Sequence, residues 1–183
     1  MPENSATNLQ KAIFLDRDGV INIDHGYTHK IEDFTFIDGV FHACRRFQAM
    51  GYAIVVVTNQ SGIARGYYSE ADFERLTDWM LQRFAEEGVD VLAVYHCPHH
   101  AKEGYGEFKL DCDCRKPKPG MLIKAANEHH LDLSQSVIVG DKISDMRAGR
   151  AAQLSKCILI TSTEPKANEY TDAWTTSLVH VRI

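Results

Sequence analysis

Hydrophobic and polar positions follow two alternating patterns along most of the chain. Short apolar runs such as Ala12–Asp16 and the β-branched Ala53–Thr58 lack the polar alternation of a half-exposed strand. Such runs are typical of parallel strands that are buried on both faces. The pattern predicts further strands at Val91–His96, Ser136–Gly140 and Lys156–Ile160, and an edge strand near Ala173–Val181.

Residues at helical spacing fill the segments between these runs. Val40, Phe41, Cys44 and Phe47 recur on one helical face, and Gly51 follows as a stop signal. Other helices are predicted from the capping pair Ser69 and Asp72 to Glu87, at Met121–His130 and at Ser144–Ala151. The alternation of strands and helices predicts an α/β fold, a Rossmann-like parallel sheet with helices on both faces.

Three long segments fit neither pattern, namely Ile23–Asp38, Gln60–Tyr68 and Pro98–Pro119. Loops of this length inside a compact domain are usually functional or held by a cross-link. The segments between strands are too short for a large cap domain, so residues 1–183 are predicted to form a single domain. Residues 1–11 are polar and predict a flexible leader without the features of an export signal, and we expect a cytoplasmic protein.

Composition excludes several classes of protein. Of the 183 residues, 44% are hydrophobic and 25% charged, which is typical of a globular chain and not of a disordered one. Lys and Arg number 20 against 25 Asp and Glu, so the net charge is −5. An acidic surface without a basic run disfavours nucleic-acid binding, and no apolar run reaches the roughly 20 residues that span a bilayer. We expect a monomer that binds neither nucleic acid nor a membrane.

Acidic residues stand at the ends of predicted strands. Asp16 and Asp18 follow the first strand, Gly19 permits a sharp turn there, and Asp141 follows the fourth strand. The carboxyl ends of parallel strands meet at one edge of the sheet, where ligands of α/β proteins bind. Three carboxylates crowded together repel one another unless a cation is present, and oxygen ligands suit Mg²⁺. The sequence therefore predicts a magnesium site.

Two further segments carry groups that bind phosphate. The second strand ends in a hydroxyl and polar side chains followed by a glycine, at Thr58, Asn59, Gln60, Ser61 and Gly62. Arg115 and Lys116 open a proline-stiffened basic segment, in which Lys118 is a rival for the role of Lys116. A lysine that points into the acidic cluster would neutralise a phosphoryl group during transfer.

Three of the five cysteines lie close together in the sequence. Cys97 and His99, then Cys112 and Cys114, offer three thiolates and one imidazole in a pattern that suits a closed, structural Zn²⁺ site. His100 is the alternative imidazole. The predicted zinc loop covers residues 97–119 and would hold Arg115 and Lys116, which directly follow the last cysteine. Cys44 and Cys157 stand apart in apolar surroundings and are interpreted as buried thiols.

The sequences DRDGV, TNQSG, RKPKPG and GDKISD occur here in the order that they have in the haloacid dehalogenase-like phosphatases, and the chain resembles this family from Ala12 to Ile160. The resemblance implies phosphoester hydrolysis with Asp16 as nucleophile and Asp18 as acid and base. Thr58 and Lys116 would hold the phosphoryl oxygens. Mg²⁺ would lie on Asp16, on the backbone carbonyl of Asp18 and on Asp141.

The cysteine pattern is similar to that of the zinc-loop branch of this family, which includes heptose-bisphosphate and histidinol-phosphate phosphatases. The first of these implies removal of the C7 phosphate from D-glycero-D-manno-heptose 1,7-bisphosphate, a step in making lipopolysaccharide heptose precursors; histidinol phosphate is the alternative substrate. On the heptose interpretation, Arg115 and Lys142 would bind the C1 phosphate. The sugar would be bound by Asp24, His25, Gly26 and Tyr27, a segment that without the family is a polar turn.

Two other functions remain open. DNA 3′-phosphatases share the DxDG and TNQ motifs, but the acidic charge and the lack of a GxxxxGK[ST] kinase loop count against that activity. A silent, zinc-stabilised binding module is disfavoured because the full set of phosphatase residues is intact. Phosphate release from the pure protein separates an enzyme from such a module.

Overall fold

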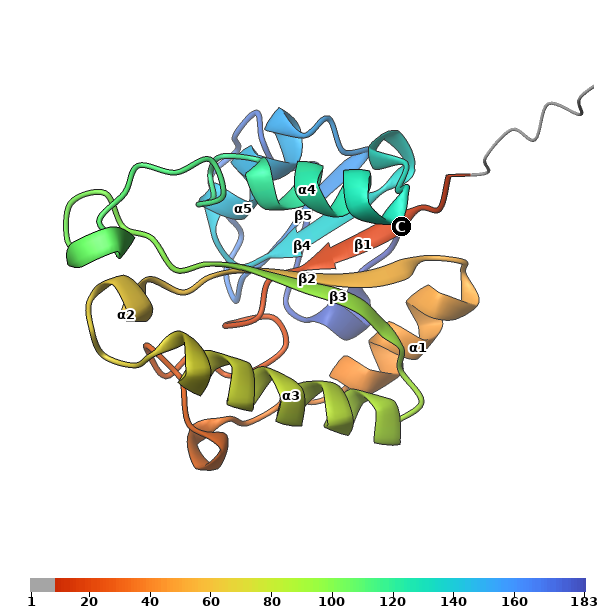
Figure 1. Cartoon of the computed structure of the whole chain (residues 1–183). Coiled ribbons are helices and arrows are strands. Elements are labelled where there is room, and N and C mark those ends of the chain that lie inside the picture. Colours follow the sequence, from red (N-terminus) through yellow and green to blue (C-terminus); the bar gives the residue numbers. More distant parts are fainter. Residues whose placement is uncertain (1–8) are drawn as a thin grey trace, which may run out of the picture.

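The computed structural model of the chain describes residues 9–183 and is built on one parallel sheet (Figure 1). The strand order is β3-β2-β1-β4-β5-β6. Neighbouring strands of this sheet run parallel to one another. The strands are β1 (Ala12–Leu15), β2 (Ala53–Asn59), β3 (Val91–Cys97), β4 (Val137–Gly140), β5 (Lys156–Ile160) and β6 (Ala173–Thr175). The predicted α/β class is confirmed, and the sheet is covered on both faces as in other proteins of that class.

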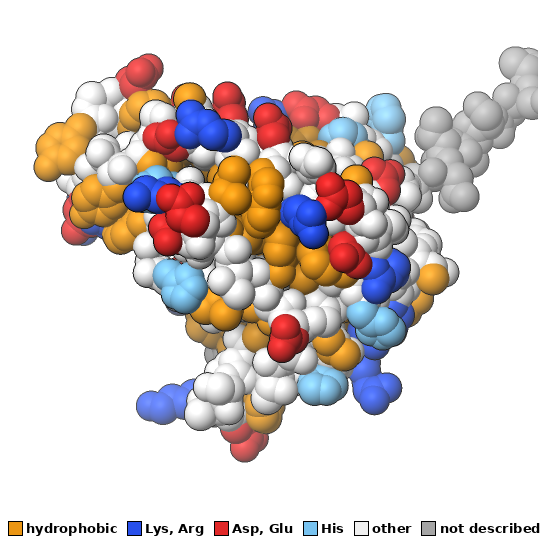
Figure 2. All heavy atoms as spheres, turned by 90° about the horizontal axis from the view of Figure 1, so that it is seen from below, with side chains coloured by type: hydrophobic (Ala, Val, Ile, Leu, Met, Phe, Trp, Pro, Cys, Tyr) orange, Lys and Arg blue, Asp and Glu red, His pale blue; other side chains and the backbone are white. Residues whose placement is uncertain are grey.

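Helices cover both faces of this sheet (Figure 1). They are α1 (Val40–Ala49), α2 (Ser61–Ala64), α3 (Glu70–Glu86), α4 (Gly120–His129) and α5 (Ile143–Ala151). In Figure 1, α1 and α3 lie below the sheet, and α4 and α5 lie above it. The lower surface carries acidic and basic side chains scattered among hydrophobic ones, without a large area of one charge (Figure 2).

The two faces of the sheet bury two separate hydrophobic clusters. Ile13 and Leu15 of β1 contribute to one cluster, and Phe14, between them in the sequence, contributes to the other. All three side chains are fully buried. Successive residues of a strand point to opposite faces, so a strand covered on both sides must be apolar throughout. This explains the unbroken apolar run in the sequence.

Sequence signals and structure agree closely at α3. The Ser69 hydroxyl accepts a hydrogen bond from the Asp72 amide at 3.1 Å, and the Asp72 carboxylate accepts one from the Ser69 amide at 2.9 Å. This reciprocal capping box satisfies amides that the helix itself cannot pair. The helix starts one residue after Ser69, as the sequence predicted.

Several predicted boundaries differ from the structure. The final edge strand is shorter than predicted because only Ala173–Thr175 pair with β5; Leu178–His180 form a 3-10 turn whose Leu178 is buried in the core. The loop predicted over 60–68 contains the short helix α2. Other 3-10 turns occur at Ile31–Asp33, Gly106–Phe108 and Leu133–Gln135.

The predicted leader falls largely on residues 1–8, which lie outside the described residues. Within its remaining part, the Gln10 amide donates to the His130 carbonyl at 3.2 Å and the Gln10 carbonyl accepts from the Asp132 amide at 2.9 Å. Part of the predicted leader is thus hydrogen-bonded to the body of the protein. Within residues 9–183, the helices are all too short or too polar to cross a membrane.

The order of the central strands determines where the site forms. Leu15, near the end of β1, is in register with Val56 of β2 on one side and with Val139 of β4 on the other. The polar residues that follow these three strands therefore emerge at the same edge of the sheet. In Figure 1 this is the edge at the left, where the long loops gather.

Candidate active site

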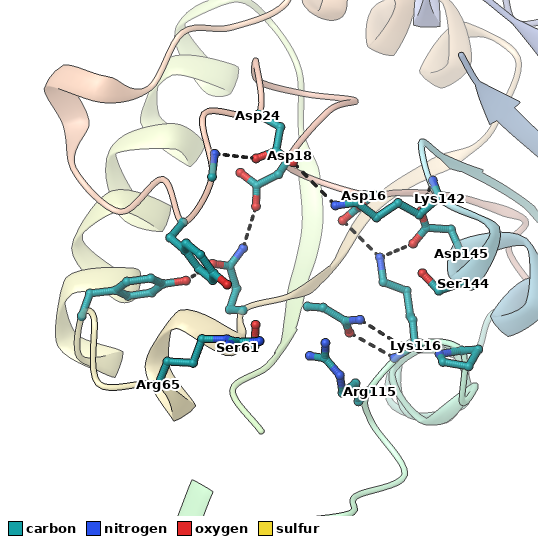
Figure 3. Close-up of a pocket in the computed structure, with 16 residues that line it drawn as sticks. Asp16, Asp18, Asp24, Ser61, Arg65, Arg115, Lys116, Lys142, Ser144 and Asp145 are labelled. Carbon is teal, nitrogen blue, oxygen red and sulfur yellow. Dashed lines mark hydrogen bonds and ion pairs between the residues drawn. The ribbon is translucent and has the colours of Figure 1, made fainter. Parts of the chain in front are cut away.

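A cavity of about 630 Å³ opens at this edge of the sheet (Figure 3). Its walls come from the ends of β1 and β2, from the segments that follow β4 and from two loops. Most of the predicted site residues line it: Asp16, Asp18, Asp24, Gly26, Tyr27, Asn59, Gln60, Ser61, Arg115, Lys116 and Lys142. Thr58, His25 and Asp141 are not among the lining residues.

Lys116 is a buried cation at the inner end of the cavity. Its Nζ lies 3.1 Å from Asp16 Oδ1 and 2.6 Å from Asp145 Oδ1, and it donates to the Val57 carbonyl at 2.7 Å. Burial alone would lower the pKa of Lys116, but the charges of Asp16 and Asp145 raise it above its usual value. The lysine is therefore held fully charged beside Asp16. Lys118, its rival in the sequence, lies at the surface and pairs with Asp111 at 2.8 Å.

Asp16, Asp141 and Asp145 form an acidic group whose nearest oxygens lie within 4.8 Å of one another. The oxygens of Asp145 are both occupied, Oδ1 by Lys116 and Oδ2 by the Lys142 amide at 3.0 Å. Asp141 Oδ1, in contrast, is a buried atom without a hydrogen-bond partner among the described residues. A divalent cation between Asp16 and Asp141 would satisfy this oxygen, so the residues present fit a magnesium ion.

The electrostatics of the same group call for a cation. Burial raises the pKa of Asp141 to about 7, and the charge of Asp16 acts in the same direction. Burial also raises the pKa of Asp16, against the opposing effect of Lys116. The charge of Lys116 thus does not bring the pKa values of these carboxyl groups back to their usual range. A bound cation would keep Asp16 and Asp141 ionised at neutral pH.

Gly19 allows the first and fourth strands to bring their acids together. Its φ of +88° lies in the left-handed region, and a Cβ built there would lie 2.3 Å from Asp141 Oδ2. A side chain at residue 19 would therefore displace the Asp141 carboxylate. The sequence predicted the sharp turn at Gly19, but it did not reveal this contact.

Asp18 lies at the cavity wall, with its side chain outside the acidic group. Its carboxylate accepts hydrogen bonds from Arg17 Nη2 at 3.1 Å, Asn22 Nδ2 at 3.0 Å and Gln60 Nε2 at 3.0 Å. Arg17 is itself buried and donates to the Thr28 carbonyl at 2.7 Å. These contacts fix the position of Asp18 relative to Asp16. The predicted contribution of the Asp18 carbonyl to a magnesium site stays a prediction.

The polar residues that end β2 organise the neighbouring segments. Asn59 exchanges two hydrogen bonds of 3.0 Å with the backbone of Lys116, one through each end of its amide. Gln60 donates to Thr58 Oγ1 at 2.8 Å and accepts from the Tyr68 hydroxyl at 2.5 Å. Asn59 and Gln60 were predicted as substrate-binding residues; in the structure they also hold Lys116 and Asp18 in place.

The predicted sugar loop reaches the cavity through three of its four residues. Asp24 Oδ2 lies 3.6 Å from Lys142 Nζ across the opening, and Gly26 and Tyr27 line the wall. Asp24 Oδ1 also accepts from the Gly26 amide at 2.9 Å, which fixes the turn. His25 is exposed and faces a different hollow, next to Thr28 and Glu32. The structure thus does not bring His25 to the cavity.

Five residues that line the cavity were not among the predicted site residues: Arg65, Tyr68, Pro117, Ser144 and Asp145. Asp145 stands one helical turn after Asp141, so the spacing of the two acids was an available signal. Arg65 and Tyr68 lie in a loop without a recognisable pattern, and only the fold brings them to the cavity. Figure 3 shows Arg65 and Arg115 on the side of the cavity opposite Asp24 and Lys142.

A second cluster of metal-binding groups lies in the loop that precedes Arg115. Cys97, His99, Cys112 and Cys114 each offer one donor atom, and these four atoms lie within 4.8 Å of one another. The Sγ atom of Cys112 lies 3.4 Å from that of Cys97 and 3.3 Å from that of Cys114. A tetrahedral zinc ion with Zn–S bonds of about 2.3 Å places its sulfurs about 3.8 Å apart. The cluster thus fits such an ion after small outward shifts.

The imidazole of this cluster comes from His99. Its Nδ1 lies 3.4 Å from Cys114 Sγ, whereas Nδ1 of His100 accepts hydrogen bonds from the amides of Lys102 and Glu103. Hydrogen bonding from Cys97 lowers the pKa of Cys114 to about 5, so one thiolate is available at neutral pH. Cys44 and Cys157 are buried away from this cluster, and burial raises the pKa of Cys157 to about 11.

Comparison with known proteins identifies the family. A model described as HAD-hydrolase-like matches residues 113–180. The D-glycero-beta-D-manno-heptose-1,7-bisphosphate 7-phosphatase of Pasteurella multocida is 55% identical over 157 residues, covering 86% of this chain and 85% of its own. The Escherichia coli K12 protein of that name is 52% identical, covering 88% of this chain and 85% of its own.

A solved structure supports the same family. The D,D-heptose 1,7-bisphosphate phosphatase from B. bronchiseptica, in complex with magnesium and phosphate, superposes with a TM-score of 0.79 at 31% identity. The match covers 92% of this chain and 94% of that one. The resemblance found in the sequence is thereby confirmed, and the chain belongs to the haloacid dehalogenase-like phosphatases, in the family of these heptose-bisphosphate 7-phosphatases.

Proposed function

We propose that this phosphatase removes the C7 phosphate of D-glycero-β-D-manno-heptose 1,7-bisphosphate. One observation carries the proposal: a single cavity holds a buried Asp16–Lys116 pair at its inner end and two further cations, Arg115 and Lys142, on its walls. The inner pair suits the phosphate that is cleaved, and Arg115 and Lys142, on opposite walls, each offer a positive charge to a phosphate that is retained. The names of the relatives favour this substrate and its β anomer.

The chemistry assigned to the inner end of the cavity follows from its free atoms. Asp16 Oδ2 has no hydrogen bond or ion pair with another of residues 9–183 and is the oxygen that would attack phosphorus while the bond from phosphorus to the C7 oxygen breaks. Asp18 would give its proton to the leaving oxygen. A water molecule would then release phosphate from Asp16 and return a proton to Asp18.

Positive charge at the transferring group comes from two sources. Lys116, whose three N–H groups face Asp16, Asp145 and the Val57 carbonyl, would turn one of them to a phosphoryl oxygen. Thr58, whose hydroxyl lies beside Gln60 at the end of β2, would bind another of these oxygens. Mg²⁺ on Asp16, Asp141 and the Asp18 carbonyl would offset the charge of the phosphoryl group and the carboxylates.

The remaining roles concern the sugar and the loop. Asp24, Gly26 and Tyr27 would contact the sugar, together with Asn59, Gln60 and Ser61; His25 would need a loop movement to take part. Zn²⁺ on Cys97, His99, Cys112 and Cys114 would be structural, since protein atoms fill all four positions. The product would supply lipopolysaccharide heptose precursors in the cytoplasm, from a monomeric enzyme.

Histidinol phosphate is the competing substrate within the same chemistry. It carries an ammonium group where the heptose carries its second phosphate. Arg115 and Lys142 would repel that ammonium and attract the phosphate. The charge of the outer cavity therefore favours the bisphosphate.

Mg²⁺-dependent phosphate release from a panel of esters tests the proposal. The panel holds both anomers of the heptose bisphosphate, histidinol phosphate and a 3′-phosphorylated oligonucleotide. We expect the highest kcat/KM for the β anomer, with the C1 phosphate retained in the product. Preference for histidinol phosphate or for the oligonucleotide would refute the assigned substrate, and retained activity in the presence of EDTA would refute the magnesium site.

A further inference from the structure

Arg65 lies where two loops from distant parts of the sequence meet at the mouth of the cavity. It follows α2 directly and lines the cavity wall (Figure 3). Nothing in the proposed chemistry uses it. Its side chain is only 22% exposed, and its Nε is a buried atom without a hydrogen-bond partner among the described residues. A largely buried arginine at this place calls for an explanation.

On one side, Arg65 is tied to the loop that carries the cysteine cluster. Its guanidinium forms an ion pair with Glu103, and the Ala64 carbonyl next to it accepts a hydrogen bond from the Tyr105 amide at 2.9 Å. Glu103 is itself held by His100, whose Nδ1 accepts a hydrogen bond from the Glu103 amide at 3.0 Å. The loop is therefore docked on the end of α2 through both backbone and side-chain contacts.

On the other side, Arg65 contacts the predicted sugar loop. Its guanidinium lies over the Tyr27 ring at 5.7 Å from the ring centroid, within cation–π range. Tyr67, two residues after Arg65, packs edge-on against the same ring at 4.8 Å. Tyr27 has a φ of +54° and is 45% exposed, so its own backbone and burial do little to fix it. The Tyr27 carbonyl is paired with His29 Nδ1 at 2.8 Å, whereas its ring is contacted by Arg65 and Tyr67.

We propose that Arg65 is a positioning residue that holds Tyr27 at the cavity mouth, with Glu103 holding Arg65. Tyr27 then contacts the sugar part of the substrate, whereas the phosphoryl group reacts at the inner end of the cavity, at Asp16 and Lys116. Arg65 therefore acts on the binding of a sugar phosphate and not on the chemical step. This inference rests on the proposed function in that the substrate is taken to be a sugar bisphosphate.

The test compares a large and a small substrate. p-Nitrophenyl phosphate carries a phosphoryl group but no sugar. For Arg65→Met, we expect the KM for the heptose bisphosphate to rise about tenfold, the effect of losing a partly desolvated cation–π contact, with kcat unchanged. The KM and the kcat for p-nitrophenyl phosphate should both stay within about twofold of the wild-type values. Glu103→Gln should give a smaller rise of KM in the same direction.

Two further variants separate positioning from direct contact. Tyr27→Ala should reproduce the KM of Arg65→Met, and the double variant should be no worse than either single one, because both remove the same contact. Arg65→Lys keeps a charge but loses the planar group and should fall between the wild type and Arg65→Met. Arg83→Met is the matched control, since Arg83 is an exposed arginine of α3 whose ion-pair partner among residues 9–183 is Glu86.

Hydrogen exchange gives a readout that does not depend on the substrate. In Arg65→Met and Glu103→Gln, amides 26–29 should exchange faster than in the wild type, while those of β1 should not change. Additive losses in the double variant, equal losses for both substrates, or unchanged exchange at 26–29 would each overturn the positioning role. If the wild type rejects the heptose bisphosphate, the proposed substrate fails, and hydrogen exchange still decides the role of Arg65.

Discussion

Lys116 Nζ lies 2.6 Å from Asp145 Oδ1, closer than to any atom of Asp16, and both side chains are almost completely buried. Asp145 therefore holds the lysine while Asp16 keeps one oxygen free to react. A buried ion pair of this kind adds little to stability, because both charges lose their hydration. Its role is to position the charge. In this site the charge is placed beside the oxygen that attacks phosphorus.

Asp145→Asn tests this relationship. The amide can still accept from Lys116, but the ionic contribution is lost, and we expect kcat/KM to fall by about 100-fold and the free energy of unfolding by about 1–3 kcal/mol. Denaturant unfolding and phosphate release measure the two effects. Asp111→Asn, which removes the partner of the exposed Lys118, is the control and should change neither. Full activity in Asp145→Asn would contradict the assigned role.

Asp16→Asn removes the proposed nucleophile while preserving its shape. We expect turnover to fall by at least about a thousandfold, because the neutral amide of asparagine is too weak a nucleophile to attack phosphorus. Circular dichroism should show an unchanged fold, since the amide oxygen can still accept from the Arg17 amide. Incubation with substrate followed by acid quenching and mass spectrometry should show a phosphoryl group on Asp16 in the wild type only. Its detection on another residue would refute the mechanism.

Gly19→Ala should damage the site through a steric contact with Asp141. The new Cβ would meet Asp141 Oδ2 at 2.3 Å, in addition to the cost of a left-handed backbone. Gly88→Ala is a matched control because Gly88 has a φ of +72° and nothing within 4 Å of its built Cβ. Both variants should lose about 1 kcal/mol of stability from the backbone alone. Only Gly19→Ala should also lose Mg²⁺ affinity, measured by titration calorimetry; equal affinities would disprove the contact.

Cys112→Ser should release the metal that we propose for the cysteine cluster. Cys112 Sγ contacts the sulfurs of both Cys97 and Cys114, so its loss opens the cluster at its centre. We expect bound zinc, measured by elemental analysis, to fall from about one ion per chain to well below half. Thermal stability and activity should fall with it, because Arg115 and Lys116 follow the cluster directly. Cys44→Ala is the control for zinc content, and a metal-free wild-type protein of full stability would contradict the prediction.

The fold was predictable from the sequence because its strands are buried on both faces. Val55 and Val56 in β2 belong to opposite clusters, so the central strands had to be apolar throughout and could not be mistaken for exposed ones. The residues after Ala173 were harder to assign. Trp174 in β6 is 42% exposed and the strand pairs on one side only, so its sequence carries little periodic signal.

The site was predictable where its residues stand at strand ends, and less so elsewhere. Asp16 and Asp141 each follow an apolar run. The run predicts that the acid lies at the carboxyl end of a strand, so its place in the fold is known as well as its residue type. Arg65 has no such marker, because its place at the cavity depends on how the loop containing Glu103 folds back onto α2. His25 shows the opposite case: it lies within a matching motif but lines a different hollow, and its part in substrate binding stays a prediction.

The pairing of β1 with β4 joins parts of the chain that are far apart, as in the hydrogen bond from the Ala12 amide to Ser136 Oγ, which spans 124 residues. Asp16 and Asp141 meet only after this pairing has formed. During synthesis on a ribosome, β1 therefore cannot pair with β4 until most of the polypeptide has emerged. Until then the apolar side chains of β1 lack the neighbour that they have in the folded protein. The active site therefore forms late in synthesis, when β4 pairs with β1, and a chain that ends before β4 would be inactive.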